Sequence, residues 1–199
     1  MRLSRNSLQM LATLVVAALP VVAHAHVEEG SLGALDGFLH PIKGADHLLA
    51  MLSVGIVSAQ IGGRSIWLVP ALFVLAMIGG GVVGLNQIMV PHVELGVALS
   101  VVALGLAIVF ADKRSNVTLV MLFVMLFGAL HGHAHGLEAP KTASPIFYSF
   151  GFVISTALIH LVGVLVGFLV TEKSRVRNAS TYLGCLVSAA GVYFLAGLY

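Results

Sequence analysis

Six apolar runs, each about as long as a helix that crosses a bilayer, follow one another along this chain. They cover residues 37–59, 66–85, 91–111, 117–138, 145–170 and 180–198. About 20 consecutive apolar residues are enough to span the hydrocarbon core of a membrane. The chain is 59% hydrophobic and 9% charged, and a soluble protein of 199 residues could not bury so much apolar surface. We therefore expect an all-α polytopic membrane protein with six transmembrane helices.

The first 25 residues have the composition of a secretory signal peptide. Its marks are a basic start, a short apolar stretch and a small-x-small cleavage site, which are Arg2 and Arg5, residues 11–22, and Ala23 to Ala25. We expect cleavage after Ala25, so that the mature chain begins at His26 and residues 26–199 form one transmembrane domain. The alternative is an uncleaved first membrane helix.

Lysine and arginine residues gather in alternate loops between the apolar runs. The loops after the first, third and fifth runs carry Arg64; Lys113 and Arg114; and Lys173, Arg175 and Arg177, whereas the outer loops carry Lys141. Loops rich in positive charge stay on the cytoplasmic side. Together with a cleaved signal peptide, this bias predicts that both termini are periplasmic in a bacterial inner membrane.

Charge and cysteine content exclude several classes of protein. The formal net charge of +2 is too small to indicate nucleic-acid binding. The single cysteine, Cys185, excludes an intramolecular disulfide and a thiolate metal cluster. Because Cys185 lies inside an apolar run, we expect it to be a small core residue.

A first group of polar side chains stands at the start of the first run. His40 and His47 are seven residues apart, which places them on one face of a helix, and Met51 follows one turn later. Asp46 points about 100° away from this face. It either binds a metal directly or orients an imidazole of a neighbouring helix. Ionisable side chains are costly inside a membrane, so this group indicates function.

A second group ends the fourth run. His131 and His135 are one turn apart and Glu138 follows seven residues after His131, so the three form a one-sided row. His133 falls off this face, and we expect it to matter less. With the predicted orientation, both groups lie in the outer half of the membrane and face each other.

Three further residues are expected at the level of these two groups. His92 and Glu94 begin the third run, and His26 would combine its freed α-amine and its imidazole in a two-point chelate. The alternatives are that His92 lies at the membrane interface and that His26 starts a flexible tail. His160, in the middle of the fifth run, has no acidic residue nearby, so we expect it to form a hydrogen bond between helices.

Imidazoles with a few carboxylates bind nickel, cobalt, zinc or copper and do not suit magnesium or calcium. The lack of thiolates argues against copper(I) and against a structural zinc site. The predicted metal ligands are His26, His40, Asp46, His47, His92, Glu94, His131, His135 and Glu138.

The two groups resemble the motifs of the HupE/UreJ family of nickel and cobalt permeases. One family motif is a histidine, five residues and then Asp-His, which here is His40 to Asp46 and His47. The other is Phe-His-Gly-x-x-His-Gly-x-Glu, matched by residues 130–138 with Leu130 in place of phenylalanine, a change that affects packing more than ligation. The resemblance covers the whole chain. It implies import of Ni²⁺, or in some members Co²⁺, for metalloenzymes such as hydrogenase and urease.

We therefore expect a secondary transporter rather than an enzyme, in which Ni²⁺ or Co²⁺ binds transiently as substrate and no cofactor is needed. No Walker A sequence is present, so transport is passive or driven by an ion gradient, with Asp46 as the candidate for proton linkage. The expected surroundings are the lipid bilayer, and a homo-oligomer is possible. The alternatives are a proton channel and an intramembrane zinc hydrolase with Glu138 as base, although the His-Glu-x-x-His motif is missing.

Overall fold

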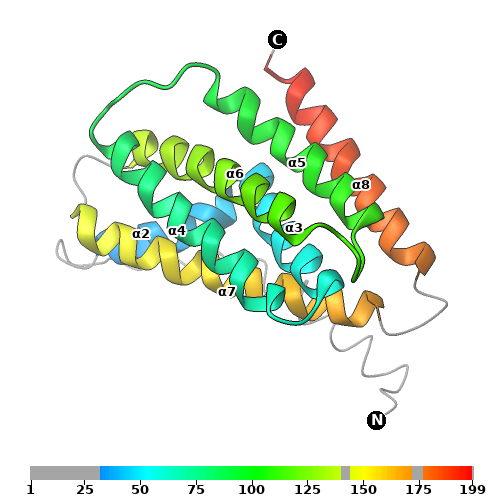
Figure 1. The fold of residues 1–199 in the computed structure, drawn as a ribbon. Coiled ribbons are helices and arrows are strands. Elements are labelled where there is room, and N and C mark those ends of the chain that lie inside the picture. Colours follow the sequence, from blue (N-terminus) through cyan, green and yellow to red (C-terminus); the bar gives the residue numbers. More distant parts are fainter. Residues whose placement is uncertain (1–31, 140–143, 172–176, 199) are drawn as a thin grey trace.

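The structure, a computed structural model, describes residues 32–139, 144–171 and 177–198, and these ranges contain seven helices (Figure 1). They are α2 (Leu32–Lys43), α3 (Ala45–Ile61), α4 (Ser65–Leu85), α5 (Val93–Phe110), α6 (Val117–Glu138), α7 (Pro145–Thr171) and α8 (Arg177–Ala196). No strand occurs in these ranges, so the expected all-α fold is confirmed for them. The predicted signal peptide and His26 lie outside the described residues.

Five of these helices, α4 to α8, are long and apolar enough to cross a membrane. Their bounds agree with the predicted runs to within a few residues. Neither α2 nor α3 alone is long and apolar enough to cross a membrane, but the two together are. The axes of this pair are bent by 82° relative to each other. The described part of the chain therefore has five candidate membrane spans, or six if the bent pair counts as one.

The expectation of one continuous first helix is wrong, because the chain breaks at Gly44, between α2 and α3. Pro41 lies inside α2 and has no backbone N–H, so the carbonyl group of Gly37 loses its donor in the helix. Gly44 then takes an extended conformation, with φ −90° and ψ 112°, before α3 begins. The break places His40 and His47 on two different helices instead of one helical face.

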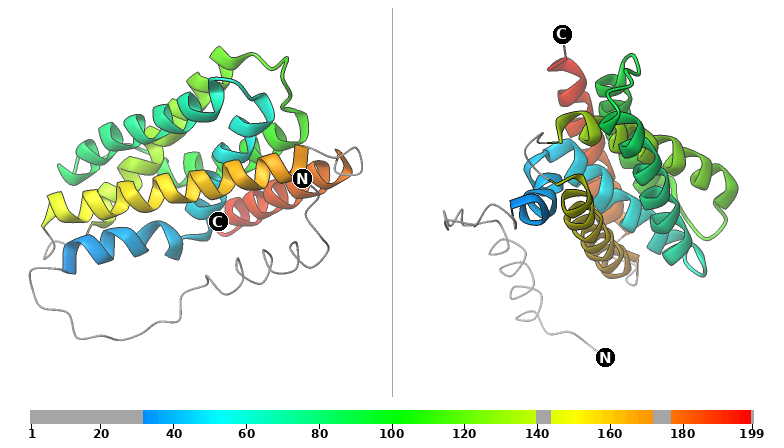
Figure 2. Two further views of the ribbon diagram at one scale, coloured as in Figure 1. Left: turned by 90° about the horizontal axis from the view of Figure 1, so that it is seen from below. Right: turned by 90° about the vertical axis from the view of Figure 1, so that its left-hand side faces the viewer.

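The central helix of the bundle is α3, which contacts each of the other six described helices (Figure 2). Around it, α4 pairs with α6, α5 pairs with α8, and α7 packs against both α2 and α3. Glycines let the backbones approach closely, as is common between membrane helices. A Cβ atom at Gly132 of α6 would overlap the carbonyl oxygen of Met77 in α4, and one at Gly55 of α3 would overlap that of His160 in α7.

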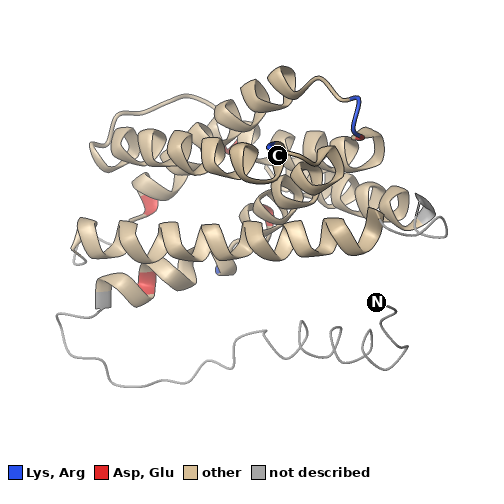
Figure 3. Cartoon of the chain, turned by 60° about the horizontal axis from the view of Figure 1, so that its bottom comes forward, with Lys and Arg blue, Asp and Glu red and all other residues tan. Residues whose placement is uncertain are grey.

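The outer surface of the bundle is apolar and its described charges lie mainly toward the helix ends. Trp67 and Phe110 are 69% and 76% exposed, as expected for side chains that face lipid. Figure 3 shows the basic loop between α5 and α6 at the opposite end of the bundle from the acidic residue of α2. Cys185 is exposed on α8, so its predicted place in the core is wrong. The reason is that α8 packs mainly against α5 and leaves its other faces uncovered.

Candidate metal centre

Four imidazoles from three helices gather near the break between α2 and α3, and we call them the histidine cluster. His40 comes from α2, His47 from α3, and His131 and His135 from α6. The ring centroid of His135 lies 4.0 Å from that of His47 and 4.7 Å from that of His40. The centroid of His47 lies 4.9 Å from that of His131. The fold thus brings together the two polar groups that are far apart in the sequence.

The carboxylate of Asp46 fixes the ring of His47. Its Oδ1 accepts hydrogen bonds from the backbone N–H of His47 at 2.8 Å and from Nδ1 of the same residue at 2.7 Å. Asp46 therefore contacts the imidazole that follows it in α3 rather than one of a neighbouring helix. Because Nδ1 donates to this carboxylate, the lone pair of the ring is on Nε2. That atom is buried and has no hydrogen-bond partner among the described residues.

Gly44 leaves room at the break for this contact. A Cβ atom at Gly44 would lie 3.0 Å from Nδ1 of His47 and 3.2 Å from Oδ1 of Asp46. Any other residue would therefore crowd the hydrogen bond that orients the imidazole. The glycine both ends α2 and leaves space for the polar pair at the start of α3.

The two histidines of α6 are the most deeply buried members of the cluster. Nδ1 of His131 donates to the carbonyl oxygen of Phe127, one turn earlier, over 2.8 Å. Nε2 of His131 therefore carries the lone pair, and it has no partner among the described residues. Neither ring nitrogen of His135 has a hydrogen-bond partner there. Buried polar atoms are normally satisfied, so these free nitrogens point to a bound ligand.

Glu138 lies at the exposed side of the cluster. Its Oε2 lies 3.2 Å from Nε2 of His40 and 3.9 Å from Nδ1 of His135. One ligand atom from each of these three residues lies within 4.8 Å of the others. Side-chain exposure falls from 53% at Glu138 to 24% at His40 and 5% at His135. The cluster is thus open at one side and closed at the other.

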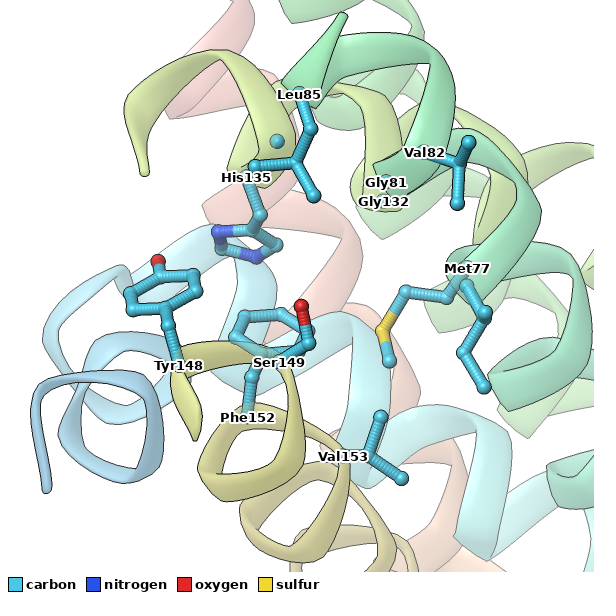
Figure 4. Close-up of a pocket in the computed structure, with 12 residues that line it drawn as sticks. Met77, Gly81, Val82, Leu85, Gly132, His135, Tyr148, Ser149, Phe152 and Val153 are labelled. Atoms are coloured by element: carbon cyan, nitrogen blue, oxygen red, sulfur yellow. The ribbon is translucent and has the colours of Figure 1, made fainter. Parts of the chain in front are cut away.

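Aromatic side chains line the cluster. The ring centroid of Phe152 lies 4.4 Å from that of His135, and Tyr148 lies 5.8 Å from His40. Figure 4 shows His135, Tyr148 and Phe152 beside a cavity of about 80 Å³ between α4, α6 and α7. Sequence reasoning missed these residues, because an aromatic side chain inside an apolar run has no spacing that marks it as part of a site.

Two of the predicted ligands lie around the cluster rather than in it. Glu94, in the first turn of α5, is exposed and close enough to interact electrostatically with Glu138 and Asp46. His92 is also exposed and precedes α5 in a left-handed conformation with φ 60°. No contact joins His92 to the histidine cluster in the part of the chain that the structure describes.

Two more buried histidines differ from each other in their partners. Nε2 of His133 lies 2.6 Å from the carbonyl oxygen of Ile88, so this ring faces the α4–α5 loop and lies off the cluster, as the helical spacing predicts. Neither ring nitrogen of His160 bonds to another helix within the described ranges, and the polar group that acts on the ring is the backbone of Thr156 in its own helix. The predicted hydrogen bond between helices is therefore wrong, because the ring faces Phe73 of α4, with centroids 5.1 Å apart.

Comparison with known proteins agrees with the resemblance found in the sequence. Residues 11–194 match the family described as HupE / UreJ protein. The chain belongs to the HupE/UreJ family. It is 36% identical over 189 residues to Protein HupE of Rhizobium leguminosarum bv. viciae, and the alignment covers 95% of this chain and 98% of that protein. No solved structure matches the chain.

The two HupE/UreJ motifs of the sequence are the two segments that meet in the structure. Residues 40–47 surround the break between α2 and α3, and residues 130–138 form the last turns of α6. Leu130, which replaces the phenylalanine of the second motif, packs against Val93 and Val97 of α5. The substitution is thus accommodated in helix packing and leaves the imidazoles that follow it in the cluster.

Proposed function

We propose that this HupE/UreJ protein is a secondary transporter that imports Ni²⁺ or Co²⁺ across the bacterial inner membrane. The observation that carries the proposal is the set of buried Nε2 atoms on His47, His131 and His135, which have no partner among the described residues. A neutral imidazole with a free lone pair is a ligand for a transition metal. The metal ion is the substrate, so it binds transiently and no resident cofactor is required.

The residues divide into three roles in this proposal: metal ligands, a carboxylate that orients one of them, and an entrance. His47, His131 and His135 bind the ion through ring nitrogens, while Asp46 orients His47 through the 2.7 Å hydrogen bond to Nδ1. A carboxylate behind a ligating imidazole fixes the ring and raises its basicity. His40 and Glu138, which are more exposed, form the entrance, and Glu94 adds negative charge beside it. Ligand roles for His92 and His26 remain predictions from the sequence.

The break in the first span supports a binding site at this depth. We propose that α2 and α3 together form one of six spans and that both termini are periplasmic, with the entrance facing the periplasm. Transporters often bind their substrate where a membrane helix is interrupted, because freed backbone groups and helix ends lie there. The basic α5–α6 loop lies away from the entrance, as the charge bias of cytoplasmic loops requires (Figure 3).

Metal uptake by reconstituted protein tests this function. Proteoliposomes that contain the wild-type chain should accumulate Ni²⁺, and added Co²⁺ should compete. We expect His47→Ala and His131→Ala to lower uptake by about tenfold or more, because each removes a ligand. Val162→Ala is the matched control, since Val162 lies on the exposed face of α7. Wild-type uptake by both histidine variants would rule out the proposed path. The zinc hydrolase alternative receives no support from the family match.

A further inference from the structure

Another buried imidazole, that of His160, lies beyond the histidine cluster and has no role in the proposed function. His160 is 2% exposed, and neither ring nitrogen has a hydrogen-bond partner of good geometry among the described residues. The polar group that acts on the ring is the backbone of Thr156, one turn earlier in the same helix. An imidazole left this way inside a membrane is costly, so it is expected to have a function.

The ring of Phe73 connects His160 to the deepest member of the cluster. Its centroid lies 5.6 Å from that of His131 and 5.1 Å from that of His160. Phe73 belongs to α4, His131 to α6 and His160 to α7, so three helices meet here. The ring of Phe73 therefore lies against both imidazoles.

The packing of the helices places His160 deeper than the cluster. Along α7, Phe152 contacts His135, and His160 follows two turns later, which corresponds to roughly 12 Å along the helix axis. Between α4 and α6, the backbone of Met77 contacts Gly132 beside the cluster. One turn deeper, the backbone of Phe73 contacts Gly128. His160 is thus at the level of this deeper contact, on the closed side of the cluster.

His160 also lines a groove of about 550 Å³ between α4 and α7. The other lining residues are apolar or aromatic. They include Ile66 and the lipid-facing Trp67 in the first turn of α4, so the groove also opens on the outer surface of the bundle. The groove therefore runs from His160 toward the end of the bundle opposite the entrance. Pro70, which also lines it, has no backbone N–H, so the carbonyl oxygen of Ile66 has no donor one turn later in the helix.

We infer that His160 is an inner binding site for the same divalent transition metal, occupied after the ion leaves the histidine cluster and before it is released on the other side. This inference rests on the proposed transport function and extends its path. One imidazole, with water or backbone oxygen completing the coordination, binds more weakly than three imidazoles. A pathway needs such a site, because an ion must be able to leave as well as enter.

Equilibrium binding of Co²⁺ to purified protein in detergent is the first test. Co²⁺ bound by imidazole absorbs visible light, so a titration resolves tight and weak equivalents. We expect the wild-type chain to bind one tight and one weaker equivalent, and His160→Ala to lose the weaker one alone. Retention of both equivalents by His160→Ala would overturn the inference.

Transport kinetics give the second test. His160→Ala should lower the maximal rate of Ni²⁺ uptake by about tenfold or more while leaving the half-saturating concentration unchanged, since the entrance cluster is intact. Val162→Ala on the exposed face of the same helix should keep wild-type kinetics. A wild-type maximal rate in His160→Ala contradicts an inner site.

Two conservative variants separate a ligand from a packing residue. His160→Cys supplies a thiolate that can bind the metal, whereas His160→Asn supplies a polar group that binds it poorly. We expect the cysteine variant to recover part of the maximal rate and the asparagine variant to recover none. Equal recovery would mean that His160 acts through packing or hydrogen bonding, and the inference would fail.

The outcomes also distinguish this inference from the function on which it rests. Absence of Ni²⁺ uptake by the wild-type chain would refute transport, while the Co²⁺ titration would still report whether His160 binds metal. Normal wild-type uptake with a fully active His160→Ala variant would refute the inner site alone. A slow His160→Ala variant that still binds both equivalents would indicate a proton relay and would also refute the inner site.

Discussion

The imidazoles of His47 and His135 lie with their ring centroids 4.0 Å apart, although one side chain comes from α3 and the other from α6. Both Nε2 atoms are buried and have no hydrogen-bond partner among the described residues. If the proposed function is right, these two imidazoles hold one ion between them. Their spacing makes the shared ligand role open to a quantitative test.

A double-mutant cycle on Co²⁺ affinity provides this test. If His47 and His135 hold the same ion, each alanine variant should weaken binding by about tenfold or more. The double variant should then lose much less than the sum of the two single losses in binding free energy, because one missing ligand already disrupts the site. Strictly additive losses would show that the two histidines bind separate ions.

Asp46 should act on metal binding through His47. Asp46→Asn keeps the shape of the side chain but removes the negative charge that accepts the hydrogen bond from Nδ1. Loss of such a supporting carboxylate usually costs about 10–100-fold in metal affinity. We expect Asp46→Asn to bind Ni²⁺ more weakly than wild type and more tightly than His47→Ala in a calorimetric titration. The reverse order would indicate that Asp46 is itself a ligand.

The close contact of α4 with α6 should be essential for the cluster. Gly132→Ala would place a Cβ atom on the carbonyl oxygen of Met77, so the two helices must move apart. Overpacking of this kind typically costs about 1–3 kcal/mol, and it would shift His131 and His135 as well. Gly79→Ala is the matched control, because no atom lies within 4 Å of the added Cβ. Thermal unfolding in detergent should separate the two variants, and equal stability would show that α4 and α6 adapt freely.

The helices and the chemistry of the cluster could be predicted from the sequence because both depend on local patterns. The lengths of the apolar runs gave five helix bounds to within a few residues. The spacing of the second motif placed His131 and His135 on one face and His133 off it, as the structure has them. These are properties of one helix, so the period of 3.6 residues is sufficient to derive them.

The break at Gly44, the partner of Asp46 and the surroundings of His160 depend on tertiary structure. Pro41 and Gly44 are both visible in the sequence, but a proline alone often only kinks a membrane helix, and the apolar run continues past it. The ring of His160 faces Phe73 of α4, a neighbour on another helix. The exposure of Cys185 depends on which faces of α8 remain uncovered. No spacing within one segment carries that information.

Metal binding should weaken as the pH falls. A proton and the metal compete for the same Nε2 lone pair, so the imidazole must be neutral to bind. Below the pH range in which the imidazoles titrate, each one that binds should lower the apparent affinity by about tenfold per pH unit. We expect the half-saturating Ni²⁺ concentration to rise as the pH is lowered, in a titration carried down to the lowest pH at which the protein stays folded. The His133→Ala variant should show the same pH dependence, since His133 bonds to the α4–α5 loop. A half-saturating concentration that stays constant down to the pH at which the protein unfolds would contradict imidazole ligands.

The charge of Glu138 should determine how well the entrance captures metal. Its Oε2 contacts His40 of α2 across a distance of 3.2 Å, and its side chain is 53% exposed, so the carboxylate meets solvent before the buried imidazoles do. Glu138→Gln keeps the length of the side chain and an oxygen that accepts the hydrogen bond, but it removes the negative charge that attracts a cation. We expect the half-saturating Ni²⁺ concentration to rise severalfold while the maximal rate stays close to that of wild type.

Ionic strength distinguishes attraction by this charge from direct coordination. Salt screens an exposed charge, with a Debye length of about 10 Å at 0.1 M. The difference in half-saturating concentration between wild type and Glu138→Gln should therefore shrink as salt is added. If Glu138 instead binds the ion directly, Glu138→Gln should lower the maximal rate as strongly as His135→Ala, and the difference should persist at high salt. Uptake by proteoliposomes at low and high ionic strength, with both variants measured side by side, decides between these roles.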